Sequence, residues 1–391
     1  MLETIASLPV IDAHCHHLTA QLAQVSADHI ARILCPGALG TPDWPSDHAR
    51  EFLSFKRMIR EMARYLGCDD GPDAVMAARA ARVRGSDAGG SCAGGSYARG
   101  SYAAYVDGML KAANIEALVL DLGFPGPDTY PEFEALTDIP RRLILRETWL
   151  SNTLAKEQLG FKEFLRRFDA YVENEVRVKG SAGLKSYIAA TTGLGVEPAS
   201  EASAETQYPE FLAGKARQTK AFNDFMFCRA ADHCIDMDVP LQVHTCIFGG
   251  RNLTMEAVRP SLLQPFLQHR RGANLKLVLV HGGFPWVEEA AALAALFPDV
   301  WLDMSQWVVW NPLMAAQRLL TILTIAPANR VMYGSDGAFI PEFHWFGALT
   351  GREAVAQAMT ELVRGEFLDE AQALTMARMI LADNARALYR L

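Results

Sequence analysis

Eight short, almost uniformly apolar runs, separated by segments with helical spacing, constrain the fold of this chain more than any other feature. Near-continuous hydrophobicity, rather than strict alternation, is typical of parallel strands that are covered on both faces. The runs lie at residues 9–14, 117–124, 142–147, 183–188, 240–245, 276–281, 300–305 and 330–336. Strand and helix alternating eight times predict an α/β fold, the (β/α)₈ barrel.

The first two runs are about a hundred residues apart, which is far more than one barrel helix needs. We therefore expect residues 1–17 to supply the first strand, 18–112 to form an α-helical insertion, and 113–391 to complete the barrel and a C-terminal helix. Gly, Ser and Ala make up 13 of the 17 residues of 85–101, which predicts a flexible surface loop.

Charge and cysteine content exclude several classes of function. There are 37 Lys and Arg against 45 Asp and Glu, and a net charge of −8 without a basic block argues against nucleic acid as a partner. No run of ~20 apolar residues occurs, and the first residues lack the pattern of a signal peptide, so we expect no membrane partner. The seven cysteines are scattered and form no Cys-x-x-Cys pair, which predicts reduced thiols and a cytoplasmic protein.

Four of the ten histidines fall at the ends of predicted strands, where barrel enzymes carry their active sites: His14, His16, His244 and His281. Residues two apart on a strand face the same side, so the imidazoles of His14 and His16 both face the barrel axis. Imidazole nitrogens suit Zn²⁺, Fe²⁺ or Mn²⁺, and a carboxylate completes such a site. We interpret the histidines as a metal site rather than as ordinary core residues.

Four motifs in strand order resemble the amidohydrolase superfamily. Within it the chain is similar to the amidohydrolase-related branch (amidohydrolase 2) that includes domains linked to glutamine-synthetase-like proteins. The motifs are Ile-Asp-Ala-His-Cys-His (11–16), Gln-Val-His-Thr (242–245), Val-His-Gly-Gly-Phe-Pro (280–285) and Tyr-Gly-Ser-Asp-Gly (333–337). The closing segment 380–389 also resembles the last helix of that branch.

The resemblance implies a distorted barrel that holds one or two divalent metals. It places His14, His16, His244 and Asp336 on the metal, and it makes Asp336 the base that takes a proton from an activated water and passes it to the leaving group. A carboxylate that touches metal and water can perform this step. Zinc is the expected cofactor, with iron and manganese as alternatives. The alternative for 334–337 is a plain turn, because Asp and Gly are turn residues.

Three further residues have open roles. His281 either binds a second metal or polarises a substrate carbonyl. Lys185 either is carboxylated and bridges two metals, as in dinuclear relatives, or pairs with an anionic group in the pocket, which we favour. Glu147, next to Arg146 at the third strand end, is a ligand, a substrate contact or part of a buried ion pair.

From these observations we expect an enzyme, a metal-dependent hydrolase that acts on an amide or other C–N bond of a small polar molecule. A fold does not determine chemistry, so non-oxidative decarboxylation and iron-dependent oxygenation stay open. A non-catalytic metal-binding subunit of a hetero-oligomer with a paralogue is a further alternative. We expect a small-molecule substrate and a homo-oligomer.

Overall fold

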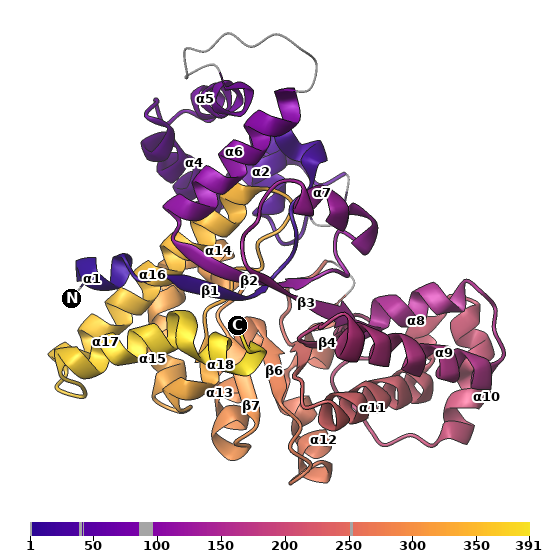
Figure 1. Ribbon diagram of the computed structural model, residues 1–391. Helices are drawn as coiled ribbons and strands as arrows, with labels where there is room; N and C mark the ends of the chain where they lie inside the picture. The colour runs from indigo at the N-terminus through magenta and orange to yellow at the C-terminus, as the bar shows by residue number, and fades with distance from the viewer. Residues whose placement is uncertain (1, 39–40, 42, 86–96, 251–252) are drawn as a thin grey trace.

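The computed structural model describes residues 2–38, 41, 43–85, 97–250 and 253–391, and a sheet of eight parallel strands forms its centre (Figure 1). The strands pair in chain order: β1 (Val10–Cys15), β2 (Ile115–Asp121), β3 (Arg141–Arg146), β4 (Gly183–Ser186), β5 (Leu241–His244), β6 (Leu277–Val280), β7 (Val300–Asp303) and β8 (Val331–Met332). The loop after β8 approaches β1, where the N–H of Ala13 donates to the carbonyl of Tyr333 (3.0 Å). The prediction of a (β/α)₈ barrel is confirmed, in a nearly closed form.

Burial on both faces explains the uniformly apolar strands. On β6, Leu277 and Leu279 pack with the surrounding helices, while Val278 and Val280 belong to a separate cluster inside the barrel. The C-terminal helix α18 (Asn384–Tyr389) contributes to this inner cluster. Each strand thus buries side chains in two directions, which removes the polar alternation of a half-exposed sheet.

The segment between β1 and β2 is largely helical (Figure 1). It contains α2 (Ala27–Ile33), α3 (Ser46–Arg50), α4 (Leu53–Leu66), α5 (Pro72–Arg84) and α6 (Tyr97–Ala112). Helix α6 packs on α5 and on the long helix α16 (Pro341–Arg364), so residues far apart in sequence lie side by side. The loop predicted over 85–101 is wrong at its end, because residues 97–101 already belong to α6. Residues 86–96 lie outside the described residues.

Each of the eight strands ends one to four residues from its predicted end, and two of these differences concern Glu147 and Asp336. Strand β3 ends at Arg146, and Glu147 begins α8 (Glu147–Ala155). Strand β8 ends at Met332, so Asp336 lies in the following loop with a left-handed φ of 59°. Side-chain bonds from Ser335 to Asp12 hold that loop outside the regular ladder. An apolar pattern marks where a strand is buried but does not reveal such a departure from β geometry.

No helix in the described ranges is long and apolar enough to cross a membrane. The six cysteines within these ranges are all free thiols.

Candidate metal centre

One cavity of about 580 Å³ lies at the carboxyl ends of the strands and collects most of the predicted site residues. Its lining includes His14, His16, Lys185, His244, His281 and Asp336. This is the end of the barrel where variable loops can shape a site without disturbing the packed core. The neighbouring residues His17 and Cys15 do not line the cavity.

Strand β1 and the loop after β8 bring two histidines onto one carboxylate. Nε2 of His14 and Nε2 of His16 each lie 3.3 Å from Oδ1 of Asp336. The ring centroid of His281 lies 5.3 Å from that of His14. Ligand atoms of His14, His281 and Asp336 all lie within 4.8 Å of one another, which is close enough to hold a single ion.

Hydrogen bonds on the far side of each ring determine the tautomers of these two histidines. Nδ1 of His14 lies 2.9 Å from Oε1 of Gln242, and the amide NH₂ of Gln242 donates to the carbonyl of Ala13 and to the hydroxyl of Tyr389. Nδ1 of His16 lies 2.8 Å from the carbonyl of Asp121. A carbonyl oxygen only accepts, so each Nδ1 carries the proton and each Nε2 presents a lone pair to Asp336.

The same logic applies to His281. The hydroxyl of Ser305 donates to Asp303, so it accepts from Nδ1 of His281 at 2.7 Å. Oδ1 of Asp303 also accepts the backbone N–H of His281 (3.0 Å). Nε2 of His281 therefore carries a lone pair and has no proton to donate to a substrate carbonyl. The tautomer favours a metal-binding or proton-accepting role over the polarising role considered from sequence.

Burial keeps the imidazoles of His14 and His281 neutral. Burial, reinforced by the charge of Lys185, lowers the pKa of His14, and burial lowers the pKa of His281 well below its ordinary value. With each Nδ1 proton directed at its own acceptor, Nε2 of His14, Nε2 of His16 and the carboxylate oxygen of Asp336 converge on one point. Such a cluster of acceptors requires a cation, and neutral imidazoles with a carboxylate are the donor set that divalent transition metals prefer. The residues present fit a divalent metal.

His244 lies at the edge of this group. Its Nε2 donates to the carbonyl of Cys246 (3.0 Å), and its ring centroid is 4.6 Å from that of His281. Burial and the nearby Lys185 lower its pKa well below the ordinary value, so Nδ1 keeps a lone pair. In the part of the chain that the structure describes, His244 belongs to no group of three ligand residues within 4.8 Å. Its role as a third histidine ligand stays a prediction.

Lys185 and Glu147 differ in whether they line the metal cavity. Lys185 lies on β4 and lines the cavity, and burial lowers its pKa to about 8. Glu147 does not line it: its carboxylate accepts from the hydroxyl of Ser186 (2.6 Å) in a separate small cavity beside α8. The site role considered for Glu147 therefore stays a prediction, which the cavity lining does not support. Arg146, the last residue of β3, lines the metal cavity instead, and burial raises the pKa of Glu147 to about 7.

Sequence reasoning missed the ion pair between Asp121 and Arg146. Nε of Arg146 lies 3.1 and 3.0 Å from the two carboxylate oxygens of Asp121, at the end of β2. Burial alone would raise the pKa of Asp121, but Arg146 and His16 hold it below the ordinary range. Gly123 leaves room for this arginine, since a Cβ there would lie 2.3 Å from Cδ of Arg146. The sequence feature that could have indicated this ion pair is the single acidic residue, Asp121, within the apolar run 117–124.

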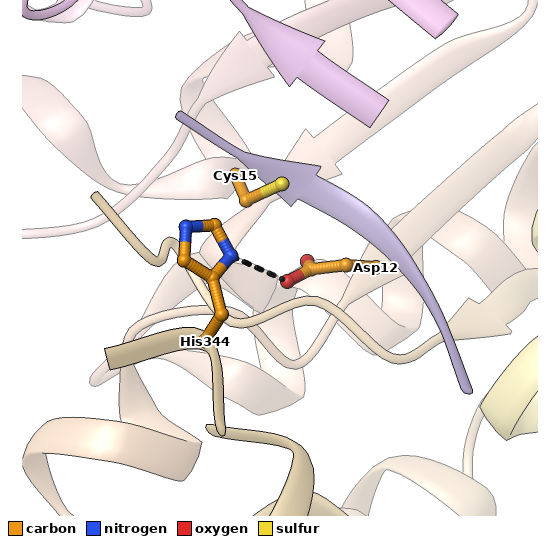
Figure 2. A group of neighbouring side chains, drawn as sticks. All are labelled: Asp12, Cys15 and His344. Atoms are coloured by element: carbon orange, nitrogen blue, oxygen red, sulfur yellow. Dashed lines mark ion pairs between the residues drawn. The ribbon is translucent and has the colours of Figure 1, made fainter. Parts of the chain in front are cut away.

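A second buried cluster lies beside β1 and consists of Asp12, Cys15 and His344 (Figure 2). Oδ2 of Asp12 is 3.7 Å from Nδ1 of His344, and Oδ1 accepts the N–H of Ser335 (2.8 Å). The hydroxyl of Ser335 in turn accepts the N–H of Gly337 (2.7 Å). None of the three residues lines the metal cavity. The cluster anchors the loop that carries Asp336.

Comparisons with known proteins agree with this geometry. The amidohydrolase family model matches residues 192–391. The protein fluG of Emericella nidulans is 26% identical over 409 residues, which cover 99% of this chain and 46% of fluG. The chain thus spans about half the length of that curated relative.

Two solved structures illustrate the shared fold. A Lactobacillus casei protein described as a metal-dependent hydrolase superposes with a TM-score of 0.84 at 23% identity, covering 99% of this chain and 96% of the other. A uronate isomerase from Bacillus halodurans gives a TM-score of 0.65 at 11% identity, with 100% and 95% covered. At such identities the likeness establishes the barrel and not the reaction. Because the family model covers more than half of the chain, including His244, His281 and Asp336, the protein belongs to the amidohydrolase family.

Proposed function

We propose that this protein is a metal-dependent hydrolase that cleaves an amide or other C–N bond of a small polar molecule. The observation that carries the proposal is the convergence of Nε2 of His14, Nε2 of His16 and Oδ1 of Asp336 with no proton donor between them. Zinc is the metal we expect, and the same donors also accept iron or manganese.

When bound, a divalent metal supplies the Lewis acidity that lowers the pKa of a water molecule toward neutrality. His14 and His16 would hold it through Nε2, with Asp336 and His281 beside them. Gln242 and the carbonyl of Asp121 keep the two Nδ1 protons on the far side of the rings, so the lone pairs stay directed at the site.

Asp336 has the position of the proton carrier. Its Oδ1 faces the two histidines, while its Oδ2 accepts from the amide of Gln306 (3.0 Å). Its backbone N–H donates to the carbonyl of His14 (2.9 Å), which ties the loop to β1. Asp336 takes a proton from the attacking water and returns it to the departing nitrogen after the C–N bond breaks.

The first experiment is elemental analysis of the protein purified without added metal. We expect about one equivalent or more of a transition metal, and a content that His14→Ala lowers sharply. A content below about a tenth of an equivalent that reconstitution does not restore would contradict the proposal.

The second experiment is a turnover screen of the metal-loaded protein against N-acyl amides, esters and aromatic acids, with and without oxygen. We expect release of amine without oxygen, loss of that release in Asp336→Asn, and full activity in the exposed control Asp47→Asn. Release of CO₂, or a product that requires oxygen, would replace hydrolysis by decarboxylation or oxygenation. Turnover that begins only when a second protein is added would indicate the subunit alternative.

A further inference from the structure

A buried cation without a partner lies in the wall of the metal cavity. The Lys185 side chain is 1% exposed, and its Nζ has no hydrogen-bond partner among the described residues. Buried charges in proteins are ordinarily paired or hydrogen-bonded, because leaving water without a partner is costly. The missing partner of Lys185 is therefore to be sought among the molecules that enter the cavity.

None of the nearby carboxylates forms an ion pair with Lys185 in the described part of the chain. Both oxygens of Asp121 accept from Arg146, and Asp336 contacts the histidines and Gln306. Oδ1 of Asp303 accepts from His281 and Ser305, while its Oδ2 has no partner among the described residues. The other acidic residue of the cavity lining, Asp43, is exposed.

A second cation stands next to Lys185. Arg146 is its direct partner across the β3–β4 ladder, and its side chain, 14% exposed, lines the same cavity. An ammonium offers a point charge and a guanidinium offers planar donors, and together they suit a carboxylate. The pair of strands thus presents to the cavity an ammonium without a described partner and a guanidinium that is already paired with Asp121.

Aromatic side chains form part of the remaining wall of the cavity. The rings of Phe124 and Phe339 meet edge to face with centroids 4.9 Å apart, and Trp310 and Phe343 form a second such pair at 6.1 Å. All four residues line the cavity. Aromatic walls bind flat apolar groups well, and a cavity of about 580 Å³ has the size of a small-molecule site.

We infer that the substrate is an organic acid with a flat apolar body, whose carboxylate binds Lys185 and Arg146 while its scissile bond lies at the histidines and Asp336. This inference rests on the proposed function and names the substrate class of the same site. The contrasting assignment is a carboxylated Lys185 that bridges two metals, and the experiment below separates the two.

The test is calorimetric binding to the metal-loaded protein with four probes: benzoate and hippurate, and their neutral amides benzamide and hippuramide. We expect each acid to bind at least about tenfold more tightly than its amide. Lys185→Met should weaken acid binding by about 10- to 100-fold and leave amide binding unchanged, as expected for a lost hydrogen bond to a charged group. Lys185→Arg should retain most of the acid preference, and the exposed control Lys162→Met should change nothing.

Three outcomes would overturn the inference. One is equal affinity of the wild-type protein for acids and amides, a comparison that needs no variant to fold. Another is unchanged acid binding in folded Lys185→Met. The third is loss of metal from Lys185→Met by elemental analysis in step with its loss of acid binding, which would indicate a bridging lysine. Benzoate has no C–N bond to cleave, so its binding is read without turnover. Acid preference without any hydrolysis of the amide probes would refute the proposed reaction and leave the carboxylate subsite standing.

Discussion

Two buried polar clusters in this protein differ in whether their hydrogen-bond donors and acceptors match. In the first, Arg79 of α5 pairs with Glu342 at the start of α16, and both residues are at most 1% exposed. The hydroxyl of Tyr105 donates to Glu342 (2.8 Å), and Arg79 also donates to the carbonyl of Ala23 (2.7 Å). In the second, the acceptors of His14, His16 and Asp336 face one another with no donor between them.

The difference separates a structural cluster from a functional one. The Arg79 cluster contains donors and acceptors that match, so it fastens the helices after β1 to α16 and needs nothing further. The metal cavity contains a group of acceptors without a donor and, in Lys185, a donor without a partner among the described residues. Each of the two therefore needs a ligand. Both clusters are largely buried, with Asp336 10% exposed in the second, and the balance of donors and acceptors is what distinguishes them.

The largest effect we expect is that of Asp336→Asn on catalysis. The variant keeps the size of the side chain but loses the charge that accepts the proton, so kcat/KM should fall by about 10³-fold or more. Its free energy of unfolding should change little, because an amide oxygen at this position can still accept from Gln306. Steady-state kinetics on a substrate found in the turnover screen, together with urea unfolding, checks both parts. Full turnover in this variant would remove Asp336 from the mechanism.

Arg79→Ala should lower the stability of the protein and leave its metal centre unchanged. It leaves the buried carboxylate of Glu342 without its cation, so we expect a loss of about 3–5 kcal/mol in the free energy of unfolding. Metal content per folded molecule should stay the same. The double variant Arg79→Met/Glu342→Leu is the matched control, and it should recover much of the loss because no charge remains buried. A loss below about 1 kcal/mol in the single variant would show that the cluster does not hold the helices.

Glu147 offers an intermediate case, a buried carboxyl group with one described partner. Burial raises its pKa from 4.5 to about 7, so the folded protein binds the proton more tightly than the unfolded chain. The stabilisation is complete below pH 4.5 and is lost as the pH rises through about 7, an effect of about 3 kcal/mol.

Glu147→Gln replaces the titrating carboxyl group by a neutral amide. The free energy of unfolding of the variant, relative to that of the wild type, should therefore rise between pH 5 and pH 8. Urea unfolding at both pH values measures the gain, with the exposed Glu256→Gln as the control. An equal difference between variant and wild type at the two pH values would argue against the raised pKa.

The smallest effect we expect is that of a change at Gln242. This residue is fully hydrogen-bonded itself, and it orients His14 in the cluster that lacks a donor. Gln242→Leu removes the acceptor that keeps the proton on Nδ1 of His14. We expect metal affinity to weaken by about 10- to 100-fold, as for other groups that orient metal ligands. Competition with a chelator measures the affinity, and the exposed Gln268→Leu should match the wild type. Unchanged affinity would mean that the tautomer of His14 does not depend on Gln242.

Local pattern was sufficient for the barrel and for most of the cavity residues. Strands buried on both faces carry their own apolar signature, and the strand ends that the pattern marked do bring His14, His16, His281 and Asp336 together. The pattern pointed to Glu147 at the third strand end, whereas β3 ends at Arg146, which lines the cavity, and Glu147 begins α8.

The sequence by itself determined which elements form and which chemical groups stand at their ends, because hydrophobic periodicity acts between near neighbours in the chain. Only the tertiary structure decided what those groups can do. The position of the proton on His14 depends on Gln242, and the conformation of the loop that carries Asp336 depends on Asp12. Asp121 accepts from Arg146, and Nζ of Lys185 has no hydrogen-bond partner among the described residues. The contacts of His14 with Gln242 and of Asp12 with Ser335 join residues more than 200 positions apart. Charge and tautomer follow from such contacts, and no local pattern records them.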